Sequence, residues 1–275
     1  MKTILFLLAA IAAAAQPRID NVLLRMVPPG TESLVGAHMD QIRGTDFYKK
    51  LVERQKLPQM EQFAKETGFD PRRDVRELLY AGTASGGALL ARGKFPLHPD
   101  VRDAKPVRHG AYTIYTFDRS GYCILDATLA VAGDVKSIAA ALDEWKTGTH
   151  TAARPLLALA HDIEPRSQFW GASSGFAGFL ADNMPRAGGA IDFSKIFQGL
   201  NDTWFQANFA AGFQAIVHGT TATEQDAVNL RDTAKGLIGF GRLSVPENQP
   251  EMLKLWDGIT VDQDKRSISH SRRYS

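Results

Sequence analysis

The sequence predicts an α+β protein built from antiparallel sheets with helices packed on one face, and an internal duplication of a strand-helix-strands-helix unit. Apolar and polar residues alternate over many short segments separated by turn residues, which is typical of β-hairpins. Residues 134–148 and 223–238 instead carry apolar residues at helical spacing behind a capping residue. The segment S-L-V-G-A-H-M-D at 33–40 aligns with S-Q-F-W-G-A-S-S at 167–174, and each reads as an apolar strand before a helix. We therefore expect two related halves.

The N-terminus has the pattern of a signal peptide. Lys2 precedes an apolar run from Ile4 to Ala15, and small residues end that run. The run is shorter than the roughly 20 residues of a membrane-spanning helix, so we expect cleavage after Ala15 rather than retention as an anchor. The expected organisation is a signal peptide at 1–15, a linker at 16–30, a first repeat at 31–150 and a second repeat at 151–275, the repeats forming either one compact domain or two.

Composition and charge favour a globular protein that does not bind nucleic acid. The chain has 275 residues, 44% hydrophobic and 23% charged, which is ordinary for a folded protein. It has 32 basic and 30 acidic residues, and loss of Lys2 with the signal leaves a net charge of about +1. A nearly neutral chain is not expected to bind nucleic acid, because phosphates must be neutralised by many basic side chains. We expect a periplasmic or secreted protein with no transmembrane span after signal removal and with a protein or small-molecule partner in the cell envelope.

The first half begins with a strand at 33–39 and a helix from Thr45 or Asp46 that Pro58 interrupts. A loop at 68–74 precedes a hairpin of two strands at 77–84 and 88–95. Its turn, G-T-A-S-G-G at 82–87, joins two strands; a phosphate-binding loop leads from a strand into a helix. A second hairpin at 112–117 and 122–126, a strand at 128–132 and a helix from Asp134 to Gly148 complete this half.

The polar loop at 96–110 is a candidate metal site. It contains the candidate ligands His98, Asp100, Asp103 and His109. Three basic residues in the same loop oppose cation binding: Arg102, Lys105 and Arg108. We therefore predict no metal site here, and no motif in the chain predicts a cofactor.

The second half begins with a short helix at 155–162 and the strand at 167–174. A hairpin of two alternating strands follows at 203–209 and 213–219. Thr223 then opens a helix with a capping box, T-E-Q-D, and this helix extends to Ile238. A short helix opens at Pro250, and a last hairpin at 259–261 and 267–271 closes the chain.

The only nucleophile motif is G-x-S-x-G, formed by Gly171, Ser173 and Gly175. In an α/β-hydrolase such a serine sits on a strand-to-helix turn. In this chain the base would be His218 or His270, and one of Asp192, Asp202 or Asp226 would orient that histidine. That fold needs a mostly parallel sheet, whereas this chain offers successive hairpins and no H-G-G-G-like oxyanion segment. We therefore interpret Ser173 or Ser174 as a helix cap and expect no catalytic residue, keeping a serine hydrolase with Ser173, His218 and Asp226 as an alternative.

Two further features bear on function. Cys123, the sole cysteine, lies in a predicted strand, so we expect a buried, inert thiol. Seven aromatic residues cluster in the second half, and they motivate a second alternative, a carrier of an apolar ligand; they are Trp170, Phe176, Phe179, Trp204, Phe205, Phe209 and Phe213. Such residues more often form a core than a cavity.

Four segments resemble exported bacterial proteins of the acidobacterial type with a duplicated α+β fold and no assigned activity. They are the A-A-A-A-Q end of the signal, F-D-P-R-R-D-V at 69–75 with A-L-L-A-R-G-K-F at 88–95, and L-W-D-G-I-T-V at 255–261. This resemblance implies export and a repeated fold; it implies no activity, cofactor or catalytic residue. We expect an exported, non-enzymatic binding or interaction protein of the cell envelope.

Overall fold

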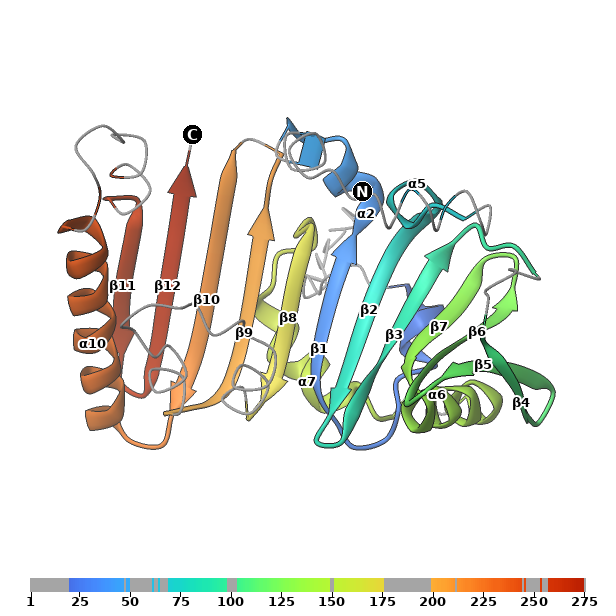
Figure 1. The fold of residues 1–275 in the computed structure, drawn as a ribbon. Coiled ribbons are helices and arrows are strands. Elements are labelled where there is room, and N and C mark those ends of the chain that lie inside the picture. The colour runs from blue at the N-terminus through green and yellow to red at the C-terminus, as the bar shows by residue number, and fades with distance from the viewer. Residues whose placement is uncertain are drawn as a thin grey trace, which may run out of the picture.

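A single antiparallel sheet of twelve strands dominates the computed structural model (Figure 1). The structure describes residues 20–46, 48–49, 61, 64, 69–97, 103–148, 151–175, 199–210, 212–243, 245, 253 and 257–274. The predicted signal peptide lies outside these residues, as do most of the predicted helix at 46–64 and the predicted helices after Ser174 and at Pro250.

The strand order is β11-β12-β10-β9-β8-β1-β2-β3-β7-β6-β5-β4. The strands of the first half are β1 (Thr31–His38), β2 (Val75–Thr83), β3 (Gly86–Gly93), β4 (Lys105–His109), β5 (Tyr112–Phe117), β6 (Ser120–Asp126) and β7 (Leu129–Asp134). Those of the second half are β8 (Phe169–Ser174), β9 (Leu200–Asn208), β10 (Phe213–Thr221), β11 (Ile259–Asp264) and β12 (Ser267–Tyr274). The halves join where β1 pairs with β8, at the centre of the sheet.

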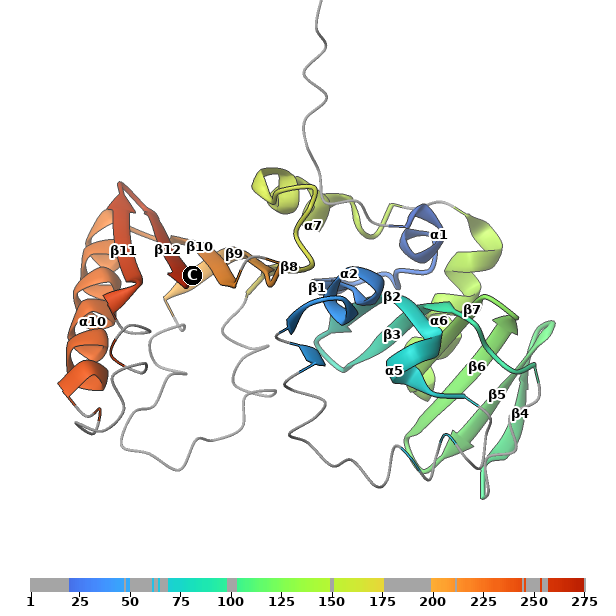
Figure 2. The ribbon, with the colours of Figure 1, turned by 90° about the horizontal axis from the view of Figure 1, so that it is seen from above.

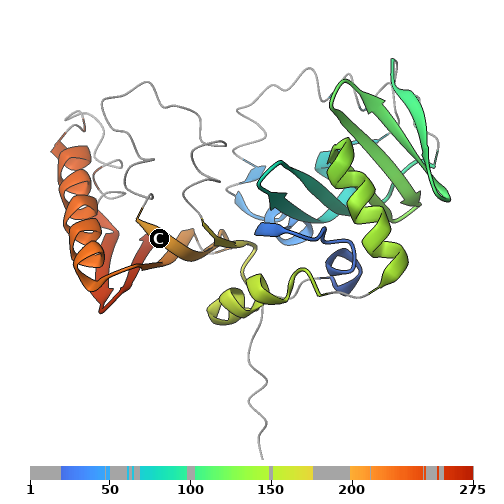
Figure 3. The same cartoon turned by 90° about the horizontal axis from the view of Figure 1, so that it is seen from below.

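Short helices and two longer ones accompany the sheet. They are α1 (Asn21–Leu24), α2 (Met39–Arg43), α5 (Pro71–Asp74), α6 (Val135–Thr147), α7 (Arg154–Leu159) followed by a 3-10 turn (Ala160–Asp162), and α10 (Glu224–Leu243). Figures 2 and 3 show α1 and α7 on one side of the sheet and α10 on the other. The expectation that helices pack on one face is therefore wrong for α10, because hydrophobic periodicity does not reveal which face of a sheet a helix covers.

Two faces of the sheet are distinguished by their helices. The α6 face carries alternate strand residues such as Leu34, Leu79 and Leu90, which are fully buried in the main core, to which α6 contributes Ile138 and Leu142. The α10 face carries the intervening residues, such as Leu89 and Ala132 in the first half and Ile268 in the second. Ile268 packs beneath α10 in a separate, smaller core.

The segment predicted as a linker at 16–30 contributes to the main core. Asp20 caps α1 by accepting a hydrogen bond from the Val22 amide at 2.8 Å. Leu23, Met26 and Val27 are at most 1% exposed. Five of the six residues at 22–27 are apolar, but the run is too short, and too close to Pro28 and Pro29, to show a helical or alternating period, so the sequence did not reveal that it packs against the sheet.

The predicted helix ends are confirmed where side chains define them. Asp134 accepts a hydrogen bond from the Ser137 amide at 3.0 Å, and Gly148 ends α6 in the left-handed conformation with φ of 69°. Thr223 accepts a hydrogen bond from the Asp226 amide at 3.1 Å, which confirms the predicted cap, and its hydroxyl donates to the Asp226 carboxylate. The predicted loop at 96–110 is partly wrong, because Lys105–His109 forms the edge strand β4.

Counting outward from the centre, the halves share a strand order, β1-β2-β3-β7-β6 against β8-β9-β10-β12-β11. The helices break this correspondence, because α6 follows β7 in the chain whereas α10 precedes β11, and they cover opposite faces. The internal duplication therefore stays a prediction.

Candidate functional site

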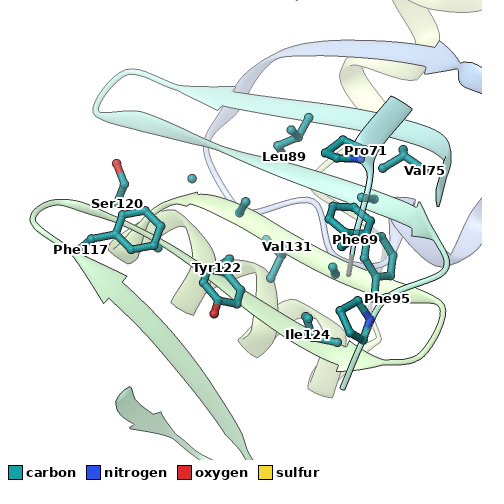
Figure 4. Close-up of a pocket in the computed structure, with 16 residues that line it drawn as sticks. Phe69, Pro71, Val75, Leu89, Phe95, Phe117, Ser120, Tyr122, Ile124 and Val131 are labelled. Atoms are coloured by element: carbon teal, nitrogen blue, oxygen red, sulfur yellow. The ribbon is translucent and has the colours of Figure 1, made fainter. Parts of the chain in front are cut away.

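A cavity of about 530 Å³ lies on the α10 face of the first half, away from α10 itself (Figure 4). Its floor is formed by three neighbouring strands, β3, β7 and β6. Cross-strand pairing sets Ala91 opposite Ala130 and Leu89 opposite Ala132, and Ala130 and Ala132 in turn pair with Ile124 and Tyr122. Small side chains at these positions leave space above the sheet that larger ones would fill.

Aromatic residues stand at both ends of the cavity (Figure 4). At one end the rings of Phe69 and Phe95 lie 5.3 Å apart, beside Pro71. At the other end Phe117 lies 6.2 Å from Tyr122, measured between ring centroids. Phe69 comes from the segment before α5 and Phe95 from the segment after β3. The chain segments that enter and leave the β2–β3 hairpin therefore meet here.

The cavity lining is almost entirely apolar. Among the described residues that line it none is charged, and Ser120 and Tyr122 supply the only polar side-chain atoms. Leu89 and Phe117 are 37% and 43% exposed, and both belong to the wall or floor. Large apolar side chains left open to solvent at one concave place are typical of a binding site for an apolar molecule.

The turn at 82–87 joins two strands, as the sequence predicts, and one of its backbone amides binds the Asp134 carboxylate. Asp134 accepts a hydrogen bond from the Gly87 amide at 2.8 Å while it also caps α6. Burial alone would raise the pKa of Asp134, but the hydrogen bonds from Ser137 and Gly87 outweigh this effect and lower the pKa. This carboxylate therefore holds the turn, the end of β7 and α6 together.

The structure places Ser173 inside β8 rather than on a strand-to-helix turn. Its side chain donates a hydrogen bond to the backbone carbonyl of Glu32 at 3.1 Å and the residue is 4% exposed. Ser174 is exposed and lies 3.5 Å from the same carbonyl. β8 continues through Ser174, and both hydroxyls contact the neighbouring strand β1. The helix that these serines were predicted to cap lies outside the described residues.

Gly171 has a packing role. A Cβ at this position would lie 2.4 Å from the ring of Phe205. Glycine lets this ring lie flat on the central strands. The G-x-S-x-G spacing is thus explained by two separate contacts within the sheet.

The hydrolase candidates do not meet. Ser173 pairs with Thr203, whereas His218 pairs with Trp204, so Ser173 and His218 lie on opposite faces of the sheet. His218 stacks on Trp204 with 5.3 Å between ring centroids, and burial lowers its pKa. Asp226 is engaged by Thr223 at the start of α10.

The other described residues of the serine hydrolase alternative are also far from one another. His270 lies on β12 and pairs with Val217 of β10. In the sheet, β12 is three strands away from β8, which carries Ser173. Asp202 pairs with Ser174 on β9, and Asp192 lies outside the described residues.

The metal candidates are not gathered either. His98 and Asp100 lie outside the described residues. Asp103 lies in a turn before β4, and the Nε2 of His109 lies 2.8 Å from Asp143 of α6. Within the described part of the chain, no three His, Cys, Asp or Glu side chains are grouped as they would be around a metal ion.

The aromatic residues that suggested a carrier are spread through the second half. Trp170 is 1% exposed in the main core, Phe205 contacts Phe169, and Phe209 contacts Phe213. Phe176 and Phe179 lie outside the described residues. The cavity instead uses aromatic residues of the first half, which sequence reasoning missed. The available signal was the alternation of alanine on β7, at Ala130 and Ala132.

A buried polar pair lies on the α6 face at the ends of β1 and β2. His38 Nδ1 lies 3.8 Å from Glu77, whose carboxylate accepts a hydrogen bond from the Asp20 amide at 3.0 Å. Burial lowers the pKa of His38 and raises that of Glu77, so both groups favour the neutral state. The contact anchors the N-terminal segment to the sheet and lies on the face opposite the cavity.

Crystal structures of TP0453 have a similar fold. Neither a protein-family model nor a curated protein matches the chain. The chain is similar in fold to crystal form I of TP0453, with a TM-score of 0.53 and 8% identity over 92% of each chain. Crystal form III of TP0453 gives a TM-score of 0.53 and 9% identity over 92% of this chain and 93% of that one. At this identity the likeness concerns the fold alone.

The described helices have no membrane-spanning candidate. Even α10, with 20 residues, lacks a sufficiently apolar stretch.

Proposed function

We propose that the protein is an exported, non-enzymatic binding protein that holds an apolar small molecule in the cavity of its first half. The observation that carries this proposal is the cavity itself, about 530 Å³ in volume with no charged side chain among its described lining residues. Pockets for small ligands commonly have volumes of roughly 300–1,000 Å³. Burying the apolar surface of a ligand here would be favourable, because exposed Leu89 and Phe117 would also be removed from water.

A binding role without chemistry accords with the surroundings of the cavity. The lining offers two hydroxyl groups and no carboxylate, imidazole or amine among the described residues. General acid-base catalysis requires such a group within hydrogen-bond reach of the substrate. His38 and Glu77, two titratable groups with altered pKa values, lie on the other face of the sheet.

Export supports this role. An apolar compound outside the cytoplasm needs a protein to carry or sequester it, and the N-terminal pattern of Lys2 followed by Ile4–Ala15 is that of a signal peptide. Fractionation of cells that express the full chain should recover it in the periplasm or medium with a mass that lacks residues 1–15. Recovery of the full-length chain in the cytoplasm would contradict export while leaving the cavity proposal intact.

The binding proposal is tested by titration with N-phenyl-1-naphthylamine, an uncharged dye whose fluorescence rises in apolar surroundings. Ala132 pairs with Leu89 on the floor, so Ala132→Leu places three extra carbon atoms in the cavity. We expect the wild-type protein to bind the dye and Ala132→Leu to bind it at least tenfold more weakly.

The matched control is Ala215→Leu. Ala215 is also a half-buried strand alanine on the α10 face, but it belongs to β10 in the second half. This variant should bind the dye like the wild type. Equal binding by all three proteins, or none by the wild type, would overturn the proposed site.

A further inference from the structure

We infer that the cavity takes a flat, uncharged compound of several fused rings rather than an extended hydrocarbon chain. This inference rests on the proposed function and specifies the class of its ligand. It follows from the shape of the floor, the position of the aromatic rings and the absence of charge in the described lining.

The shape of the cavity is that of a broad, shallow slot. Its floor crosses β3, β7 and β6, which gives a width of about 10 Å at the usual strand spacing. On β6 the lining runs from Ser120 to Ile124, which gives a length of about 13 Å. A volume of about 530 Å³ spread over a floor of this size makes the cavity shallower than it is wide or long.

A slot of these proportions matches a planar ring system better than a chain. Carbon atoms in contact lie about 3.5–4.0 Å apart, so one extended chain lying along the slot would cover about half of its width. The uncovered half of the floor would stay in contact with water. A fused ring system of three or four rings extends in two dimensions and would contact Ala91, Ala130 and Ala132 together.

The ends of the slot also favour rings. Phe69 and Phe95 at one end, and Phe117 and Tyr122 at the other, would meet the edges of a planar ligand. Edge-to-face contacts between aromatic rings are favourable beyond the area they bury. A charged group would find no counter-charge among the described lining residues and would lose its hydration on entry.

Competition against bound N-phenyl-1-naphthylamine tests the inference with three probes. Pyrene is flat and uncharged, 1-dodecanol is an uncharged chain, and pyrene-1,3,6,8-tetrasulfonate has the same rings with four negative charges. We expect pyrene to displace the dye at a concentration at least tenfold below that of 1-dodecanol, and the tetrasulfonate to have no effect. The advantage of pyrene should disappear in Ala132→Leu and persist in Ala215→Leu.

The outcomes separate this inference from the proposed function. Displacement by 1-dodecanol as strongly as by pyrene, still sensitive to Ala132→Leu, would overturn the ring inference and leave an apolar binding site in place. Displacement by the tetrasulfonate would overturn the requirement for an uncharged ligand. If the dye does not bind to the wild-type protein at all, the proposed function and this inference both fail.

Discussion

Gly36 of β1 pairs directly with Trp170 of β8, and the indole ring of Trp170 occupies the space where a side chain at Gly36 would begin. A Cβ at Gly36 would lie 2.2 Å from that ring. Trp170 is 1% exposed, so the ring cannot turn outward without leaving the core. This contact lies where the two halves of the sheet join, and it makes the central pair of strands sensitive to a single methyl group.

Gly36→Ala should therefore destabilise the protein by about 3 kcal/mol, because overpacking a buried site forces the neighbouring groups to shift. Urea denaturation followed by tryptophan fluorescence measures the change in unfolding free energy. Gly199→Ala is the control, since nothing lies within 4 Å of a Cβ at that position. A loss of unfolding free energy for Gly36→Ala no larger than that of the control would show that the paired strands β1 and β8 tolerate the extra methyl group.

Ser173→Ala should cost about 1 kcal/mol, because the variant loses one buried hydrogen bond to the Glu32 carbonyl. Ser174→Ala, at an exposed serine 3.5 Å from the same carbonyl, should cost less. Thermal unfolding of the two variants measures the difference. We also expect no labelling of Ser173 by a fluorophosphonate probe, and specific labelling there would revive the serine hydrolase alternative.

The His38 and Glu77 pair should make stability depend on pH in two opposing ways. Burial lowers the pKa of His38, so its contribution is fully present above its ordinary pKa of 6.5 and is lost as the pH falls below that value. Burial raises the pKa of Glu77, so its contribution is present below its ordinary pKa of 4.5 and is lost as the pH rises through the raised value. The hydrogen bond from the Asp20 amide and the charges of Arg92 and Arg76 lower the pKa of Glu77, whereas the charge of Asp20 raises it.

His38→Gln should flatten the loss of unfolding free energy as the pH falls below 6.5, whereas Glu77→Gln should steepen the loss as the pH falls further toward 4.5. Urea denaturation at several pH values measures both slopes. Parallel curves for wild type and His38→Gln would mean that His38 titrates alike in the folded and unfolded chain.

Cys123 should be unreactive in the folded protein. It is fully buried in β6, and burial raises its pKa to about 11, so about one thiol in a thousand is ionised at pH 8. Ellman's reagent should show no rapid reaction with the native protein and one reactive thiol in guanidinium chloride. Rapid stoichiometric reaction of the native protein would contradict the packing of β6.

The hairpins and the capped helices could be predicted because their signals are local. Asp134 and Gly148 mark the two ends of α6, and Thr223 with Asp226 marks the start of α10. The edge strand Lys105–His109 was missed because its exposed, charged residues show no apolar alternation. Such composition is common in edge strands, where charge discourages pairing with another chain.

The cavity could not be predicted from the sequence, because it depends on which strands are neighbours. Ala91 and Ala130 are 39 positions apart in the chain and become opposite partners only in the folded sheet. Phe69 and Phe95 each look like ordinary core residues until the hairpin between them brings them together. Alternation tells which residues share a face of one strand, but the order of strands is set by the whole fold.

The most direct test of the apolar site is an NMR titration of protein labelled with ¹³C at its alanine methyl groups. Ala91, Ala130 and Ala132 lie on the cavity floor, whereas Ala207 and Ala215 lie on the second half of the sheet. Addition of pyrene should shift the first three signals through its ring current and leave the other two unchanged. Shifts concentrated at Ala207 and Ala215, or no shift at any alanine, would contradict a ligand site in this cavity.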